Sequence, residues 1–120
     1  MKTLLTAVML LIISTTAPVP MPFELEYANS GITVIEFNAS FNSGNSVDWL
    51  NNLSDCKGKR IDIAADPAMQ KDHKIVVVPT IIVFNEGEEV TRFQANIMMQ
   101  LEATQKDIQE AVDEILMSSF

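Results

Sequence analysis

The sequence predicts an α/β domain in which helices sandwich a mixed β-sheet. Two runs, residues 32–38 and 80–84, are almost continuously β-branched or aromatic, which is typical of strands covered on both faces. Near the end of the chain, apolar residues recur at helical spacing, and the expected core face is Ile108, Ala111, Val112, Ile115 and Leu116. The expected order is β-α-β-α-β-β-α, a crossover followed by a hairpin and a terminal helix.

The composition is that of one globular domain with an acidic surface. The chain has 120 residues, of which 48% are hydrophobic and 20% are charged. Sixteen acidic residues stand against eight basic ones, which gives a formal net charge of −8. This charge argues against nucleic-acid phosphates or an anionic membrane as partners, because neither would be attracted.

The first part of the chain has the pattern of an export signal. Lys2 precedes an apolar run over residues 4–13, and small residues follow. This pattern predicts a signal peptide over residues 1–17 and an exported protein, periplasmic or secreted, although the segment could also be kept as an apolar strand or anchor. Prolines at 18, 20 and 22 make residues 18–31 an extended lead-in. Residues 32–120 are then the expected domain.

Local patterns place the remaining elements of the first half. Residues 42–46 are rich in Asn, Ser and Gly and predict a loop. A short helix is expected over 47–53, capped by Ser46 or Asn45, with Trp49 as a core anchor. A short strand is expected over 60–64, and Pro67 after Asp66 predicts the start of a helix. His73, near the end of that helix, is expected to be solvated.

In the second half, a hairpin turn at 85–88 follows the buried strand. Residues 92–101 then alternate between apolar and polar, which predicts a long, half-exposed strand. Met98 and Met99 are expected to pack beside the last helix. Thr104, with Asp107 three residues on, predicts the cap of that helix.

Four segments resemble the thioredoxin family in order and spacing. Residues 37–46 read Phe-Asn-Ala-Ser-Phe-Asn-Ser-Gly-Asn-Ser, against the family's Phe-Trp-Ala-x-Trp-Cys-Gly-Pro-Cys-Lys. Residues 61–63 match its Val-Asp-Val strand, residues 75–80 its Ile-x-x-x-Pro-Thr, and residues 84–88 its Phe-x-x-Gly-Glu. The resemblance covers residues 32–116 and implies a thioredoxin-like fold.

The same resemblance implies a degenerate active site. Asn42 and Asn45 stand where the family has its two cysteines, and Ser43-Gly44 replaces Gly-Pro. An amide cannot act as the thiolate of disulfide exchange, so thiol–disulfide oxidoreductase chemistry is not expected at this site. The two asparagines are either drifted loop residues or hydrogen-bonding groups for a partner.

The resemblance also assigns residues around this site. Pro79 is implied to be the cis-proline and Val78 the adjacent backbone edge, and these two residues together with Phe41 are the expected peptide-binding residues. Glu36 is implied to be the buried carboxylate, which could pair with a neighbouring Lys or Arg. Neither a cofactor nor a metal site is expected, because His73 is the only histidine and Cys56 the only cysteine.

Three functions remain open at this point. The first is a redox-inactive module that binds a protein or extended peptide through the cis-proline loop, for chaperoning, assembly or a structural role. The second is an oxidoreductase that uses Cys56. Its thiolate form would be favoured by three basic residues if they lie close in space: Lys57, Lys59 and Arg60. The third is a structural subunit, viral, phage-encoded or exported, that self-associates through the edge at 92–101.

Overall fold

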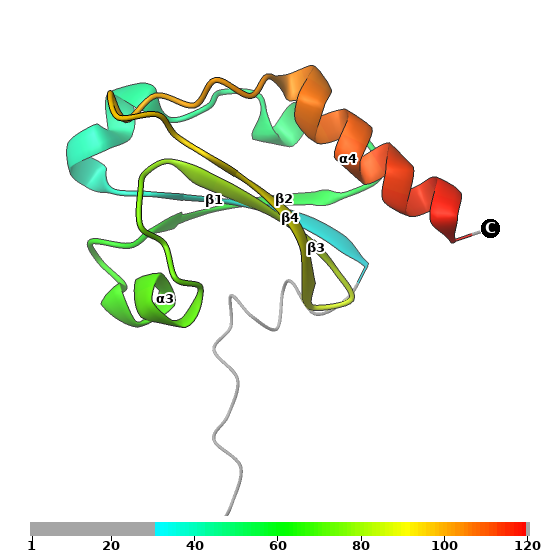
Figure 1. The fold of residues 1–120 in the computed structure, drawn as a ribbon, viewed down its shortest axis with the longest axis horizontal. Helices are drawn as coiled ribbons and strands as arrows, with labels where there is room; N and C mark the ends of the chain where they lie inside the picture. Colours follow the sequence, from blue (N-terminus) through cyan, green and yellow to red (C-terminus); the bar gives the residue numbers. More distant parts are fainter. Residues whose placement is uncertain (1–30, 120) are drawn as a thin grey trace, which may run out of the picture.

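The computed structural model describes residues 31–119 (Figure 1). The predicted signal peptide, nearly all of the lead-in and the last residue of the domain therefore lie outside the described residues. In chain order the elements are β1 (Ile32–Asn38), the 3-10 helices η1 (Ser40–Asn45) and η2 (Leu50–Asn52), β2 (Lys57–Asp62), α3 (Pro67–Asp72), β3 (Thr80–Asn85), β4 (Glu88–Gln94) and α4 (Gln105–Ser118). No helix among residues 31–119 is long and apolar enough to cross a membrane.

The four strands form one mixed sheet in the order β2-β1-β3-β4. β1 runs parallel to β2 and antiparallel to β3, and β3 pairs antiparallel with β4. Helices α4 and α3 lie on opposite faces of this sheet (Figure 1). The predicted α/β architecture, a mixed sheet between helices, is confirmed.

The two predicted buried strands form the centre of the core. All seven residues of β1 are buried, and alternate side chains point to opposite faces. Ile35 and Phe37 pack with Met69 on the α3 face, whereas Val34 packs with Ile108 on the α4 face. Each such side chain contributes about 1.5–3 kcal/mol by leaving water, so the apolar runs hold both layers together.

Both helix caps follow the sequence expectation. The Thr104 hydroxyl accepts from the Asp107 N–H, and the Asp107 carboxylate accepts from the Thr104 N–H, which completes a capping box. The Asp66 carboxylate accepts from the Met69 N–H at the start of α3, where Pro67 occupies the first turn. The buried residues of α4 are Ile108, Val112 and Ile115, all on the predicted core face.

The predicted helix over 47–53 is wrong. Only a 3-10 turn, η2, forms there, and the predicted loop at 42–46 lies largely within η1. One reason is that a backbone group needed for a helix is used elsewhere: the Val47 carbonyl, which would accept from the Asn51 N–H in a helix, accepts from the Arg60 guanidinium instead. β2 also starts three residues earlier than predicted, at Lys57.

The predicted long strand over 92–101 is also wrong beyond Gln94, where β4 ends. The side-chain oxygen of Asn96 accepts from the N–H groups of Met98, at 2.9 Å, and Gln100, at 3.2 Å. The Asn96 N–H donates to the Gln100 carbonyl, and Met99 adopts a left-handed φ of 59°. Asparagine competes well with strand pairing in this way, so residues 96–100 form a tight turn. Met98 and Met99 are exposed rather than packed beside the last helix.

The expectation that His73 is solvated is wrong as well. Its ring lies between those of Phe37 and Phe84, at centroid distances of 5.2 and 5.6 Å. The Nε2 atom is buried without a hydrogen-bond partner among the described residues. Burial of the ring lowers the pKa of His73, because the charged form loses its water. Trp49 does pack against the α4 cluster, although it is only partly buried.

Candidate functional site

The segment whose sequence resembles the thioredoxin active-site segment is held together by hydrogen bonds of amide side chains. Asn38, at the end of β1, donates to the Asn42 carbonyl at 3.1 Å and to the Ser46 hydroxyl at 2.7 Å. Asn45 donates to the Asn42 side-chain oxygen at 2.9 Å. Asn42 is buried, Asn45 is half-buried, and Ser43 and Gly44 are exposed at the tip of η1. The two asparagines at the cysteine positions therefore bond to each other.

Asn42 also joins this cluster to two distant segments. Its side-chain nitrogen lies 3.2 Å from the Asn38 side-chain oxygen, 3.4 Å from the Val78 carbonyl and 3.2 Å from the Met99 carbonyl. An amide nitrogen carries two hydrogens, so these three acceptors share them. A cysteine thiol is only a weak, single donor and could not make the same links. The Asn42 side chain therefore links η1 to two segments that are distant in the sequence.

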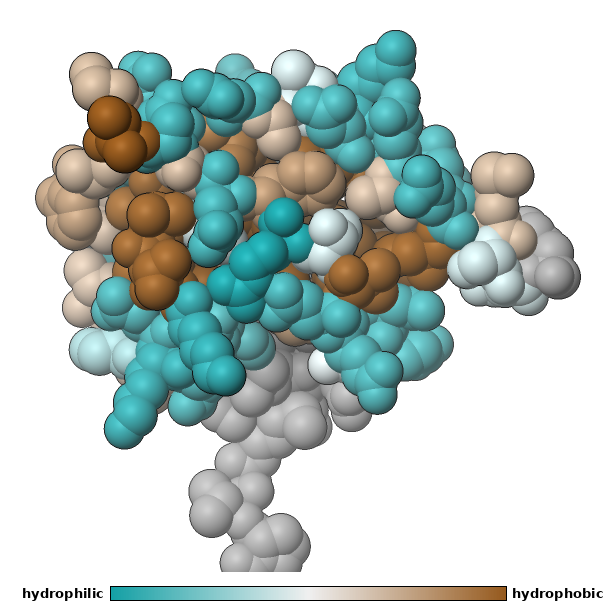
Figure 2. Space-filling view, viewed as in Figure 1, coloured by the Kyte–Doolittle hydropathy of each residue, from teal (hydrophilic) through white to brown (hydrophobic). Residues whose placement is uncertain are grey.

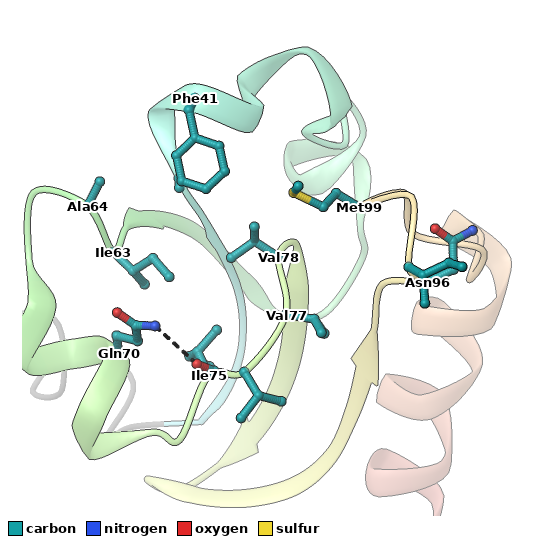
Figure 3. Close-up of a pocket in the computed structure, with 12 residues that line it drawn as sticks. Phe41, Ile63, Ala64, Gln70, Ile75, Val77, Val78, Asn96 and Met99 are labelled. Atoms are coloured by element: carbon teal, nitrogen blue, oxygen red, sulfur yellow. Dashed lines mark hydrogen bonds between the residues drawn. The ribbon is translucent and has the colours of Figure 1, made fainter.

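An apolar groove lies beside this cluster. Its volume is about 380 Å³, and Figure 3 shows Phe41 from η1, Ile63 and Val78 directed into the same space. The Gln70 side chain of α3 donates to the Ile75 carbonyl at 3.3 Å, which ties α3 to the Pro79 loop, defined here as residues 75–79. None of the described residues that line the groove is charged: Ala39, Phe41, Ile63, Ala64, Gln70, Ile75, Val76, Val77, Val78, Asn96, Ile97 and Met99.

Large apolar side chains around this groove are unusually exposed. The exposed fractions are 75% for Phe41, 76% for Val76 and 97% for Ile97. Figure 2 shows hydrophobic, brown side chains gathered on the side of the molecule where η1 and the turn at 96–100 lie. Grouped exposure of this kind makes the surface a candidate interaction surface, whereas single exposed apolar residues carry no such meaning.

The structure brings together two of the three residues predicted to bind a peptide. Phe41 and Val78 line the groove, while Pro79 is buried behind it. The Val78–Pro79 peptide bond is cis, as the resemblance implied. Sequence reasoning missed Val76, Ile97 and Met99, because the predicted strand placed the last two residues on a sheet face. The Asn96 turn signal, an asparagine after a run of strand residues, could have revealed them.

Glu36 is fully buried and fully paired. Its carboxylate accepts from the Val47 N–H at 3.0 Å and from the Arg60 side chain at 2.6 Å, and the Arg60 guanidinium also donates to the Val47 carbonyl. Arg60 is half-exposed and covers the carboxylate from the solvent side. This pairing with a neighbouring Arg was one of the sequence expectations. Through these hydrogen bonds, Glu36 and Arg60 link β1, β2 and the segment after η1.

Cys56 lies apart from the groove, half-buried against the α4 cluster. Burial raises the pKa of the Cys56 thiol, and the nearby carboxylates of Asp55 and Asp113 raise it further. The groups that shift the pKa of Cys56 are therefore carboxylates and not the basic residues that were expected to favour the thiolate if they lay close. Thiolate is the reactive form, so the structure disfavours this thiol as a nucleophile.

The described residues hold no group of three His, Cys, Asp or Glu side chains that could bind a metal ion. The apolar groove beside η1, called the Phe41 groove below, offers apolar surface and the polar side chains of Gln70 and Asn96.

Comparison with known proteins identifies the fold. No protein-family model and no curated protein matches the chain. Solved structures do match. A single-residue mutant of thioredoxin from Halobacterium salinarum superposes with a TM-score of 0.63 at 18% identity, over 84% of this chain and 95% of that one. Thioredoxin from Schistosoma mansoni superposes with a TM-score of 0.59 at 17% identity, over 76% of this chain and 82% of that one.

A third match, thioredoxin from Fasciola hepatica, has a TM-score of 0.55 at 13% identity and covers 76% of this chain and 86% of its own. These likenesses show that the chain has a thioredoxin-like fold. At such low identity they show the fold alone, and fold does not fix function. The function has to be argued from the residues that this chain carries at the site.

Proposed function

We propose that this chain is a redox-inactive thioredoxin-like module that binds an extended, apolar segment of a protein partner in the Phe41 groove. The observation that carries the proposal is the uncharged groove bordered by Phe41, Val76 and Ile97, three large side chains that are each at least three-quarters exposed. Leaving them in water is unfavourable, and a partner side chain that covers them gains about 1.5–3 kcal/mol.

The side chains at the site support the proposal of redox inactivity. The positions that carry thiols in the family are Asn42 and Asn45, and both amides are already hydrogen-bonded within the chain. The one thiol, Cys56, lines no part of the groove, and its raised pKa suppresses the thiolate. Disulfide exchange needs a thiolate beside the bound partner, and this arrangement offers none.

Partner affinity should come mainly from side-chain burial. Strand addition beside Pro79 would use the Val78 backbone, but Val78 is buried and its carbonyl already accepts from Asn42. The Val77 carbonyl likewise accepts from the Thr80 hydroxyl, at 2.7 Å. Pairing through this edge is therefore the smaller contribution, and alternating apolar side chains are the larger one.

The test is a binding titration with a fluorescein-labelled peptide that alternates serine with leucine and carries no charge. We expect Val76→Glu and Ile97→Glu to weaken binding at least tenfold, because each places a charge at the apolar groove. Met117→Glu is the matched control, since Met117 is 73% exposed on α4, away from the groove. Equal loss in all three variants, or no binding by the unaltered chain, would contradict the proposal.

A further inference from the structure

A second groove lies on the other side of the molecule, between β4 and α4. Its volume is about 590 Å³, and it shares no residue with the Phe41 groove. Val90, Phe93 and Ile115 form an apolar floor, and Val90 is about half exposed. In Figure 2 brown atoms lie between α4 and the β3–β4 hairpin, with hydrophilic, teal atoms on either side.

The lower wall of this groove is a sheet edge. Among residues 31–119, β4 pairs only with β3, so its outer side ends the sheet. Glu88, Glu89, Val90 and Gln94 are exposed along it. An edge strand presents a row of backbone N–H and C=O groups at strand spacing, and an extended chain can satisfy them by adding as a further strand.

The upper wall is acidic. Asp107, Glu110 and Glu114 lie on one side of α4 and line the groove, while no Lys or Arg among the described residues does. Asp107 is used in the helix cap, but Glu110 and Glu114 make no ion pair with a described residue. They are four residues apart on the helix, where like charges repel. A cation held between α4 and the strand edge would remove that repulsion.

We propose that the β4 edge and the acidic side of α4 together bind an extended, basic segment of a second protein. The segment would pair with the β4 backbone as a fifth strand. Its alternate side chains would face α4, because successive strand residues point to opposite faces. Lysine or arginine at those positions would meet Glu110 and Glu114, and their aliphatic stems would cover Val90 and Phe93.

The acidic charge of the groove favours a basic segment of another protein over two other segments that could fill it, the chain's own residues 1–30 and a second copy of the chain. Residues 1–30 of the chain itself hold one basic residue, Lys2, against Glu24 and Glu26, and prolines at 18, 20 and 22 remove backbone donors. A second copy joined edge to edge would bring its own α4 acids toward the same groove. Both are therefore disfavoured relative to a basic segment.

The test is a calorimetric titration of the full chain with two short peptides, one alternating lysine with valine and one alternating glutamate with valine. We expect only the lysine peptide to bind, more weakly as salt is added, with amide NMR shifts in residues 88–94. Glu114→Lys should weaken binding about tenfold, and Asp113→Lys should change it less than twofold. Asp113 is the matched control because it is the neighbouring acid on α4 but does not line this groove.

Three results would overturn this inference. Equal weakening by Glu114→Lys and Asp113→Lys would show that only net charge matters. Self-association in sedimentation with protection of the β4 amides would identify a second copy as the occupant. Absence of lysine-peptide binding, with the β4 amides already protected in the monomer, would identify the chain's own first residues. Ile97→Glu should leave lysine-peptide binding intact, so failure of this inference is distinguishable from failure of the Phe41 groove.

Discussion

Replacing Asn42 by alanine should destabilise the chain more than any other change at the degenerate site. The Asn42 side chain spans η1, the Pro79 loop and the turn at 96–100 through two shared hydrogens, and its oxygen accepts from Asn45. Three hydrogen bonds at about 1 kcal/mol each give a loss of about 3 kcal/mol. Native domains have only about 5–15 kcal/mol of stability, so the effect should be large.

Urea unfolding followed by circular dichroism measures this loss. With an m-value of about 1 kcal/mol/M for a domain of this size, the midpoint should fall by about 3 M. Asn45→Ala is the control, because it removes one donor from a half-buried residue and should cost under about 1 kcal/mol. If Asn42→Ala and Asn45→Ala unfold at the same urea concentration, the hydrogen bonds of the Asn42 side chain do not hold the three segments together as argued.

Three further predictions concern groups outside the groove. Because burial lowers the pKa of His73, the unfolded chain binds a proton at His73 more readily than the folded chain does. The contribution of His73 to stability should therefore be full above about pH 6.5 and decline as the pH falls below it. His73→Gln should make the urea midpoint less dependent on pH in that range, and an unchanged pH dependence would contradict the lowered pKa of His73. Arg60→Ala should cost about 3 kcal/mol in urea unfolding, because it uncovers the buried Glu36 carboxylate, and Arg60→Lys should recover only part of it. Cys56 should react slowly with a thiol reagent at about pH 8 and rapidly once guanidinium unfolds the chain, and equal rates would refute its raised pKa.

The layers of the fold were predictable because they depend on local patterns. The burial of β1 on both faces follows from a run that is mostly β-branched or aromatic. The α4 core face and its capping box follow from helical spacing and from two residues, Thr104 and Asp107. No partner elsewhere in the chain has to be known for either feature.

The two elements that were predicted wrongly depend on hydrogen bonds between side chains and the backbone, which local patterns do not reveal. In the helix expected over 47–53, the Val47 carbonyl would bond to the backbone one turn on, but it accepts from Arg60, thirteen positions away. The strand expected over 92–101 is lost to a side chain, since Asn96 bonds to the backbone that a strand would use. Alternation of apolar residues continues through this turn, so periodicity alone could not detect the change.

Only part of the candidate site could be predicted from the sequence. The family resemblance implied that Asn42 and Asn45 stand at the cysteine positions and that Phe41 and Val78 lie near the cis-proline, and Phe41 and Val78 do line a groove. The bond from Asn42 to Met99 joins residues 57 positions apart, and nothing local in the sequence signals it. The exposure of Ile97 depends on the same turn and was therefore hidden as well.

The most direct single test is the turbidity of insulin treated with dithiothreitol, measured with the unaltered chain and with Cys56→Ser. Reduced insulin chains are extended and apolar, so a redox-inactive binding module should delay turbidity, and Cys56→Ser should delay it equally. Faster turbidity that disappears in Cys56→Ser would show disulfide exchange and would contradict redox inactivity. Turbidity identical to that with dithiothreitol alone would contradict binding in the Phe41 groove.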